Sequence, residues 1–256
     1  MIQTLNKHVK WRKDNSAIFI CDCKRLIDLK ISFKYESFMK RLSNGIEKEK
    51  LIEEEKLVFS DFEKMKLLSE LKIKNLSEKD FSKAMKILDS ELSKGRVRSN
   101  KFLFNKFNKF PQFFIGIFLD KEIIGVICGF PREDYLLISE IAIDSKFHKR
   151  GFGKILIERF EEVARKGKYN KINVGAEDNV INFYSFLDYK PFLLVQYKKG
   201  DYILENFSEL DIFRKSEDKN QILLEVKVND FNLSLLKKFR ESYPKAWFQY
   251  IFTKSF

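Results

Sequence analysis

Two glycines separated by a single residue, Gly151 and Gly153, are the feature of this sequence with the clearest chemical meaning. They lie in the segment His148-Lys149-Arg150-Gly151-Phe152-Gly153-Lys154. A near-continuous apolar run at residues 135–143 precedes the segment, as in a strand buried on both faces, and an amphipathic helical pattern follows it. Glycine lets the backbone approach a ligand closely, and the free N–H groups of a helix's first turn favour an anion. The segment is therefore predicted to bind a pyrophosphate group.

Two common phosphate-binding motifs do not fit this segment. A Rossmann fingerprint needs a third glycine and an acidic residue after the following strand, and a P-loop needs Gly-x-x-x-x-Gly-Lys-Ser/Thr. The segment instead resembles the acyl-CoA-binding motif of the GNAT superfamily of N-acetyltransferases, Gln/Arg-x-x-Gly-x-Gly/Ala, with His148 at its first position. The alternative is an ordinary turn between a strand and a helix.

A second segment, residues 177–192, resembles another signature of that family, Asn-x-x-Ala-x-x-Phe/Leu-Tyr-x-x-x-Gly-Phe. Tyr184 falls on the tyrosine that in the family donates a proton to the leaving CoA thiolate. Glu177 stands in the place of the usual Asn, and Asp188 stands where Gly normally ends the helix. The alternative for Tyr184 is a core tyrosine of an amphipathic helix.

The expected elements support the resemblance, which covers roughly residues 71–204. Their order is strand 71–76, a helix from 77, a hairpin of 113–119 and 123–130, strand 135–143, the helix after the glycines, strand 171–174, the helix carrying Tyr184, and strands near 202–204. The resemblance implies a mixed α/β (α+β) domain with the GNAT fold around a mixed central sheet.

The chemistry that the resemblance implies is transfer of an acetyl or other acyl group from acyl-CoA to an amine by direct attack. Tyr184 would be the acid. For the base we expect Glu140, because it is an ionisable residue within an apolar strand, where burial would raise its pKa. Strand alternation could equally place it in solvent, and Glu177 or Asp134 acting through water, or loss of the proton to solvent, are alternatives. The resemblance assigns acyl-CoA binding to Ile141, Ala142, Ile143, His148, Lys149, Arg150, Gly151, Phe152, Gly153, Lys154 and Asn179.

Length and composition limit the remaining possibilities. The 256 residues exceed one such domain of about 150 residues, so further modules should flank it. No apolar run of membrane-spanning length occurs and the N-terminus is polar, which predicts a cytoplasmic protein without a membrane partner. The three cysteines agree with a reducing compartment and are expected to be small core residues. They show no metal-ligand spacing with His8 and His148, so no metal is expected.

The net charge of +12 raises the question of nucleic-acid binding, which is not favoured because Asp and Glu are interleaved with the scattered Lys and Arg. One exception is residues 94–110, which hold six basic and no acidic residues with Phe between them. This segment would recognise an acidic or aromatic acceptor, or would be a solvated helix that packs its Phe side chains inward.

Residues 1–70 have their own pattern. Two short strands are expected at 17–21 and 26–29, followed by a helix that ends at Asn44-Gly45, a second helix from Glu47, and a third that starts at a capping box at 60–63. A hairpin with three helices is a winged-helix-like plan. Together with residues 9–12, this hairpin and its helices are faintly similar to PqqD-like domains, which bind leader peptides. A winged-helix DNA-binding domain and a plain packing module are the alternatives.

The C-terminal residues 205–256 are expected to form a strand-helix-strand extension. A polar stretch at 214–220 leads to strand 223–228, a helix at 232–241 and strand 247–252. Such a unit exposes apolar faces when it stands alone, so it should dock on the GNAT sheet. The domains expected are therefore 1–70, 71–204 and 205–256.

These patterns together predict an acyl-CoA-dependent N-acyltransferase. Its acceptor would be an amine, either on a peptide or on a small molecule, and the sequence specifies neither the acceptor nor the number of subunits. The alternative is a non-catalytic protein that senses acyl-CoA, or a winged-helix protein that binds DNA or peptide.

Overall fold

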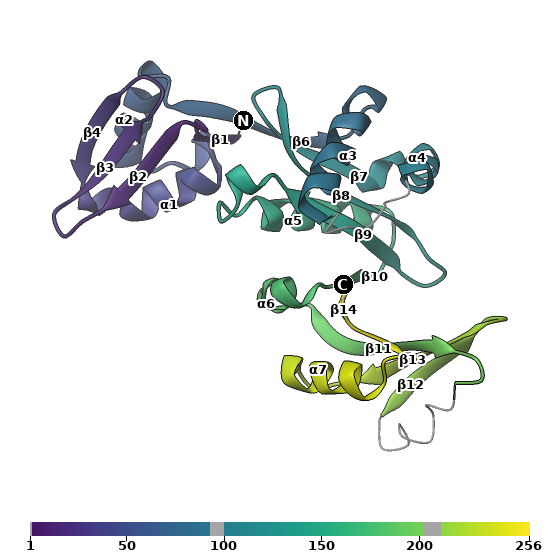
Figure 1. Ribbon diagram of the computed structural model, residues 1–256. Coiled ribbons are helices and arrows are strands. Elements are labelled where there is room, and N and C mark those ends of the chain that lie inside the picture. The colour runs from purple at the N-terminus through teal and green to yellow at the C-terminus, as the bar shows by residue number, and fades with distance from the viewer. Residues whose placement is uncertain (1, 93–99, 202–210) are drawn as a thin grey trace. The chain divides into compact units, whose positions relative to one another are not determined.

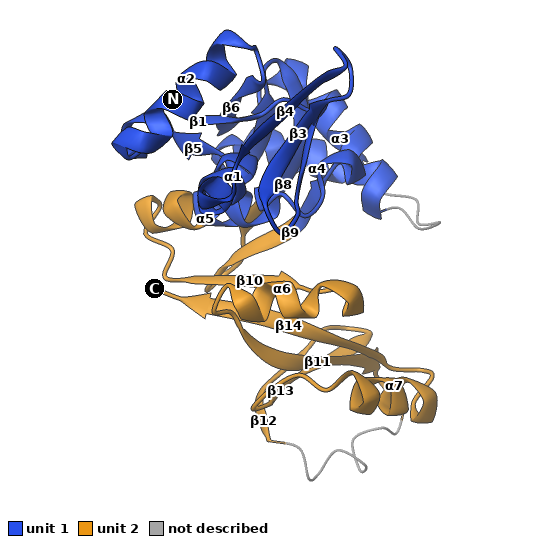
Figure 2. Cartoon of the chain, turned by 90° about the vertical axis from the view of Figure 1, so that its left-hand side faces the viewer, with its two compact units in different colours: residues 1–128, 140–160 blue, residues 129–139, 161–256 orange. Residues whose placement is uncertain are grey.

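The computed structural model describes residues 2–92, 100–201 and 211–256, and the chain divides into two compact units (Figure 2). Unit 1 consists of residues 1–128 and 140–160, and unit 2 of residues 129–139 and 161–256. Strand β9 (Leu136–Ile143) and helix α5 (Phe152–Lys166) each have residues in both units. The strand predicted near residues 202–204 lies outside the described residues.

Unit 1 contains antiparallel strands in the order β5-β1-β6-β7-β8. Their bounds are β5 Ile46–Glu47, β1 Ile2–Leu5, β6 Leu68–Asn75, β7 Phe114–Leu119 and β8 Glu122–Pro131. The predicted hairpin is confirmed as β7 and β8, and its turn contains Asp120 in the left-handed conformation at φ 56°. Asp tolerates this conformation because its short side chain can accept a local hydrogen bond.

Two helices cover one face of these strands, as Figure 1 shows. Helix α3 (Glu78–Leu92) begins as predicted: the Ser77 N–H and hydroxyl both donate to the Asp80 carboxylate. Helix α4 (Asn100–Lys109) follows. Phe107 lies between the Phe81 and Phe114 rings, at centroid distances of 5.0 and 5.4 Å. The described part of the basic segment 94–110 is therefore a helix that packs Phe107 inward.

The N-terminal module, residues 2–67, has a core of its own. A three-stranded antiparallel sheet, β2 (Val9–Lys13), β3 (Ala17–Asp22) and β4 (Ile27–Ser32), packs with helices α1 (Glu36–Asn44) and α2 (Glu53–Lys64). The expectation of three helices is wrong here, because α2 continues through Ser60. Buried Phe59 and Phe62 keep the helical pattern across that residue, and the helix starts later, where the Ile52 N–H donates to Glu55.

Strand β1 connects this module to the larger sheet. Residues Ile2–Leu5 pair with Leu68–Leu71 of β6 along the whole strand. The N-terminal module is thus hydrogen-bonded to the first strand of the predicted GNAT domain. The predicted domain limits, 1–70, 71–204 and 205–256, stay predictions.

Unit 2 has strands in the order β9-β10-β14-β11-β13-β12. The added bounds are β10 Lys171–Gly175, β11 Lys190–Lys198, β12 Ile212–Glu217, β13 Gln221–Lys227 and β14 Trp247–Ser255. The β9–β10 pair is parallel and the other pairs are antiparallel, so the fold contains the expected mixed sheet. Strand β14 lies between β10 and β11, which confirms that the C-terminal strand-helix-strand segment docks on the sheet.

The stretch 214–220 was expected to be a polar connection, and this expectation is wrong. Residues 212–217 are strand β12, which pairs with β13 at the end of the strand order. The strand is polar because most of its side chains are exposed, while Phe213 contacts the Phe192 ring at 5.7 Å. An edge strand with one apolar anchor lacks the alternation that identifies a half-buried strand.

Helices α6 (Ile181–Phe186) and α7 (Leu233–Ser242) pack against strand β14. The Phe239 ring of α7 stacks on Phe248 at 5.5 Å, and the Tyr184 ring of α6 lies 5.6 Å from Phe252. Lys254 of the same strand donates to both oxygens of Glu161, at 3.0 and 3.2 Å, and to the Leu187 carbonyl at the end of α6, at 3.0 Å. One lysine therefore joins β14 to α5 and to α6.

The cysteines are free thiols, and they are less uniformly buried than expected. Cys128 is buried in the core, Cys21 is half-buried and Cys23 is exposed in the turn after β3. The Asp28 carboxylate on the neighbouring strand raises the pKa of the Cys21 thiol to about 12, so this thiol is protonated at neutral pH.

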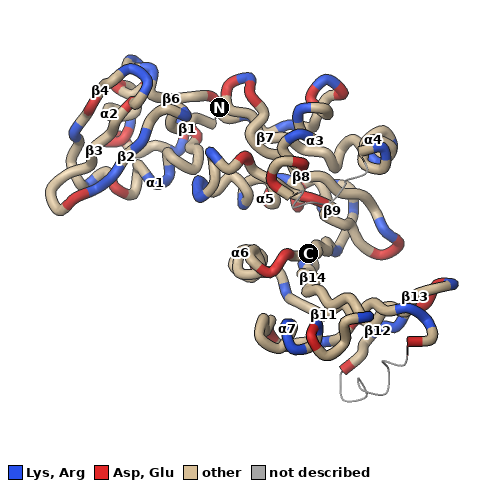
Figure 3. The backbone as a smooth tube through the Cα atoms, in the orientation of Figure 1, with Lys and Arg blue, Asp and Glu red and all other residues tan. Residues whose placement is uncertain are grey.

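Lys and Arg are distributed along the described chain with Asp and Glu between them (Figure 3). Within the described residues no helix has the length and apolar character needed to cross a bilayer, and no three His, Cys, Asp or Glu side chains form a possible metal site.

The buried ion pair of Lys254 gives a stability prediction. Replacing Lys254 by Met leaves the Glu161 carboxylate, whose side chain is only 5% exposed, with Arg165 at 3.4 Å as its remaining cation. We expect the free energy of unfolding in urea to fall by roughly 2–3 kcal/mol. The double variant Lys254→Met with Glu161→Met should recover most of the loss. Lys237→Met, which removes an exposed ion pair with Glu241, is the control and should change stability little. A Lys254→Met variant as stable as the wild type would contradict the prediction.

Candidate functional site

The loop between β9 and α5 has the backbone shape expected of an anion site. After β9, Asp144 caps a short turn at Ser145–Phe147, and Lys149 and Gly151 then adopt left-handed conformations with φ of 60° and 75°. Helix α5 begins at Phe152, directly after Gly151. The first N–H groups of a helix have no intrahelical acceptor, and left-handed residues in series turn backbone N–H groups toward a common point. The loop can therefore present several donors to one anion.

The His148 side chain is exposed, but its ring contacts the protein on one side. Its Nε2 lies 2.7 Å from the Ile143 carbonyl and 3.7 Å from Glu91 Oε2, at the end of α3. The same Glu91 accepts a hydrogen bond of 3.0 Å from the Ser145 N–H. These contacts hold the loop against β9 and α3. That His148 binds the cofactor stays a prediction. Because its ring contacts Ile143 and Glu91, we expect the backbone of His148 rather than its ring to contact the cofactor.

Arg150 connects the loop to the N-terminal module. Its guanidinium donates to the Leu5 carbonyl at the end of β1, at 2.9 Å, and lies 5.4 Å from the centre of the Phe152 ring. Burial lowers the pKa of Arg150, which still remains charged at neutral pH because an arginine pKa starts above 12. The side chain anchors the loop, and of the two lysines beside the glycines, Lys154 pairs with Glu158 at 3.7 Å while Lys149 is exposed.

Asn44, at the end of α1, lies against Gly151. A Cβ atom built on Gly151 would be 3.2 Å from Asn44 Cγ and 3.4 Å from its Oδ1. The sequence indicates only a helix end at Asn44-Gly45, and no local pattern connects that end with the glycine loop. Asn44 is therefore a residue of the site that sequence analysis missed.

The strand before the loop carries the other predicted residues of unit 1. Ala142 is buried in the core under α3 and α4, while Ile141 and Ile143 are half-buried. Glu140 is also half-buried, with its Oε2 atom buried, and the alternation of the strand places it on the same face as Ala142. The carboxylate thus lies in a partly desolvated position within an apolar strand.

Tyr184 is on α6 in unit 2, and its side chain is 3% exposed. Its ring contacts Phe183, Tyr189 and Phe252 at centroid distances of 5.3, 6.0 and 5.6 Å. Burial raises the pKa of Tyr184, and the Glu177 carboxylate raises it further. The hydroxyl therefore keeps its proton at neutral and mildly alkaline pH.

The end of α6 shows how Asp188 replaces the expected glycine. Asp188 adopts the left-handed conformation at φ 64°, and the next N–H, of Tyr189, donates to the Tyr184 carbonyl at 3.1 Å. This is the helix-ending arrangement for which glycine is usual.

Asn179 lies ahead of α6 and is exposed in the turn Asp178–Val180. Arg240 stabilises this turn by donating a hydrogen bond of 2.6 Å to the Asp178 carboxylate.

Residues 75–189 match the model of the acetyltransferase (GNAT) family, and this range contains both the loop and Tyr184. This segment, somewhat less than half of the 256 residues, therefore resembles the GNAT family of N-acetyltransferases. The resemblance to PqqD-like domains has no such support.

Three solved structures are similar to this chain at low sequence identity. Ard1 from Thermoplasma volcanium is 16% identical, with 62% of this chain and 99% of that chain covered and a TM-score of 0.45. The ribosomal-protein-S18-alanine N-acetyltransferase from Escherichia coli is 14% identical, with 64% and 98% covered and a TM-score of 0.43. Diaminobutyrate acetyltransferase from Paenibacillus lautus is 13% identical, with 64% and 99% covered and a TM-score of 0.44. No match was found among curated proteins.

The left-handed Gly151 gives the first prediction for this site. In Gly151→Val the β-branched residue disfavours φ of 75° and its Cβ would meet Asn44, so the loop has to move. We expect acetyl-CoA to bind at least tenfold more weakly by calorimetry, about 1.4 kcal/mol. Gly200→Val is the matched control, because Gly200 has φ of 98° but open space around it. Unchanged affinity in a folded Gly151→Val protein would exclude the loop as the pyrophosphate site.

The position of Asn44 gives a second prediction. Asn44→Asp places a negative charge beside Gly151, which should repel a bound pyrophosphate by about 1 kcal/mol and raise the Kd of acetyl-CoA roughly fivefold. Turnover with S-acetylpantetheine, which lacks the pyrophosphate, should be unaffected. Asn108→Asp, an equal charge change on the exposed face of α4, is the control. An equal loss with both acetyl donors would show that the substitution acts through the fold.

Proposed function

We propose that this protein transfers an acetyl or other acyl group from acyl-CoA to an amine by direct attack, without a covalent enzyme intermediate. The observation that supports the proposal is the occurrence, within one family match, of a left-handed glycine loop at the start of α5 and a buried tyrosine on α6. The loop fits a pyrophosphate, because it combines free helix N–H groups with the Lys149 and Lys154 side chains.

The predicted donor site uses the strand end and the loop in different ways. We infer that the backbone of Ile141 to Ile143 lies along the pantetheine arm, and that the N–H groups from Lys149 to Lys154 bind the pyrophosphate. Asn179 is inferred to add a polar contact from the exposed turn before α6. In this arrangement Gly151 and Gly153 keep side chains away from the phosphates.

Tyr184 is inferred to protonate the thiolate. In the reaction the amine nitrogen bonds to the thioester carbon, the carbon–sulfur bond breaks, and the sulfur takes a proton. Burial keeps the tyrosine protonated until the thiolate forms, and a thiolate in apolar surroundings is a stronger base than one in water. Charge therefore need not build up in the site.

Glu140 is inferred to take the proton that the amine loses, directly or through a water. Its half-buried carboxylate is the titratable group within the apolar strand that leads to the loop. Water-mediated transfer to Glu177 or Asp134, or loss of the proton to solvent, are the alternatives that experiments with Glu140→Gln would address.

The acceptor is proposed to be an amine on a peptide or a small molecule, in a cytoplasmic setting that agrees with the free thiols. For a peptide, the edge strand β4 offers unpaired backbone groups to an added strand. A winged-helix-like role of the N-terminal module stays a hypothesis. A non-catalytic acyl-CoA sensor would bind acetyl-CoA without releasing thiol in the presence of amines.

The test of the proposal is Tyr184→Phe. Loss of the acid should lower kcat by about 10²-fold, measured as thiol release from acetyl-CoA with a mixture of amines, while the Kd of acetyl-CoA changes little. Tyr197→Phe is the matched control, since Tyr197 is 3% exposed on β11 and its buried hydroxyl has no hydrogen-bond partner among the described residues. Wild-type turnover in Tyr184→Phe would assign the tyrosine to core packing alone.

A further inference from the structure

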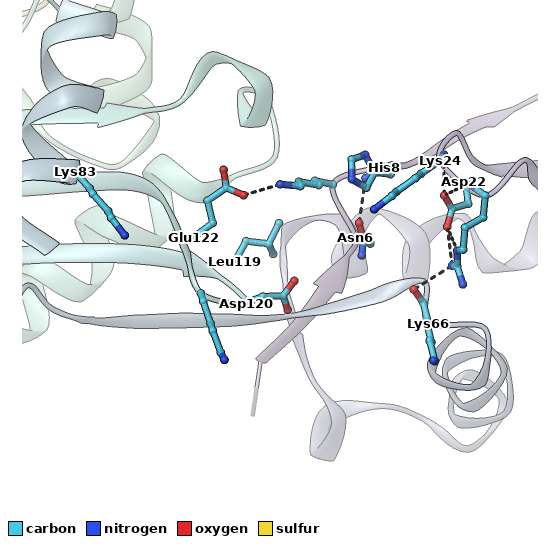
Figure 4. A pocket seen from close by; sticks show the side chains of 12 residues that line it. Asn6, His8, Asp22, Lys24, Lys66, Lys83, Leu119, Asp120 and Glu122 are labelled. Carbon is cyan, nitrogen blue, oxygen red and sulfur yellow. Dashed lines mark hydrogen bonds and ion pairs between the residues drawn. The ribbon is translucent and has the colours of Figure 1, made fainter. Parts of the chain in front are cut away.

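Unit 1 contains a concave site whose lining includes none of the residues proposed for acyl-CoA binding or catalysis (Figure 4). It is a groove of about 690 Å³. Its walls come from the turn after β1 at residues 6–8, the β3–β4 turn at 22–25, Lys66 after α2, Lys83 on α3, and the β7–β8 turn at 119–122. The groove thus lies between the N-terminal module and the first hairpin of the GNAT segment.

The acidic groups of the groove already have partners. Glu122 accepts from Lys7 at 2.6 Å, and Asp22 pairs with Arg25 at 2.6 Å while accepting the backbone N–H groups of the β3–β4 turn. Asp120 accepts the N–H of Glu70 at 3.0 Å. Two of the three carboxylates are thus paired with Lys7 and Arg25, and the third accepts a backbone N–H.

Besides Lys7 and Arg25, which are paired, the groove is lined by four lysines: Lys24, Lys66, Lys83 and Lys121. All four are exposed, and among the described residues none of them forms an ion pair. They come from four different elements, and Figure 4 shows the groove extending from Lys83 to Lys24 and Lys66. A row of separate point charges suits an extended ligand with several negative groups better than a single small anion.

The other lining groups distinguish between kinds of polyanion. The groove is lined by no Phe, Tyr or Trp and by one imidazole ring, that of His8, so it offers little surface on which successive nucleic-acid bases would stack. It also has exposed carboxylate oxygens of Glu122 and Asp120, which repel phosphodiesters but can accept hydrogen bonds from peptide N–H groups. We propose that this groove binds an acidic segment of a polypeptide.

This inference goes beyond the proposed function and does not depend on it. An acidic segment held in the groove would bring its polypeptide to the enzyme whether or not that polypeptide is acetylated, and binding can be measured without acetyl-CoA. If the polypeptide is the acceptor, the groove would raise kcat/KM by increasing the local concentration of the amine.

The probe for the test is a fluorescein-labelled octaglutamate peptide, with an uncharged Gly-Ser octapeptide as the reference ligand. Fluorescence anisotropy should show binding of octaglutamate that weakens between 50 and 200 mM salt, since screening acts on exposed charges. The charge-reversal pair Lys66→Glu with Lys121→Glu should weaken binding at least tenfold. Lys219→Glu with Lys238→Glu, two exposed lysines of unit 2 that do not line the groove, makes the same change in net charge and should weaken it less than twofold.

Several outcomes would overturn the proposal. Equal losses in both double variants would mean that only net charge matters. Duplex DNA or RNA that binds more tightly than octaglutamate, with the same loss in the groove variant, would assign the groove to nucleic acid. Displacement of octaglutamate by saturating CoA would make the groove part of the donor site. If the charge reversal lowers the thermal midpoint, Lys24→Gln with Lys83→Gln tests the same groove without introducing negative charge.

Discussion

The start of α5 imposes the constraint on which the proposed donor site depends. A helix start leaves N–H groups without intrahelical acceptors, and the left-handed Lys149 costs roughly 1 kcal/mol, so the loop needs other contacts to hold it. Three contacts do so: His148 on the Ile143 carbonyl, Glu91 on the Ser145 N–H, and Arg150 on the Leu5 carbonyl. All three use groups that lie away from the first turn of α5, so its N–H groups stay available to an anion.

The N-terminal module belongs to this arrangement more closely than an accessory domain would. Strand β1 covers the edge of β6, its last residue accepts from Arg150, and Asn44 forms one wall beside Gly151. A chain without this module would expose the edge of β6 and leave the Arg150 guanidinium without its acceptor, at a cost expected for a buried donor. The contacts that hold the glycine loop therefore extend beyond the residues that match the family.

The parts of the structure that could be predicted from sequence are those fixed by local signals. The apolar strand, the glycines and the amphipathic helix lie next to each other, so β9, the loop and α5 were all expected, and Asp188 was expected to take a glycine's place. The missed features depend on contacts between distant segments. Asn44 contacts Gly151 from helix α1, which belongs to the core of the N-terminal module. Helix α2 continues through Ser60 because Phe59 and Phe62 are buried. Strand β12 is polar because it lies at the edge of the sheet.

The environment of the proposed acid, Tyr184, also depends on a segment that is distant in the sequence. Tyr184 lies inside the matched segment, but the burial that raises its pKa depends on β14, whose Phe252 covers the ring and whose Lys254 holds the end of α6 through the Leu187 carbonyl. Glu161 fixes that lysine from α5, the helix that begins at the glycine loop. Lys254 also lies 5.3 Å from the centre of the Tyr189 ring, just after the end of α6. The burial of Tyr184, which belongs to the segment that matches the family, therefore depends on the last strand of the chain.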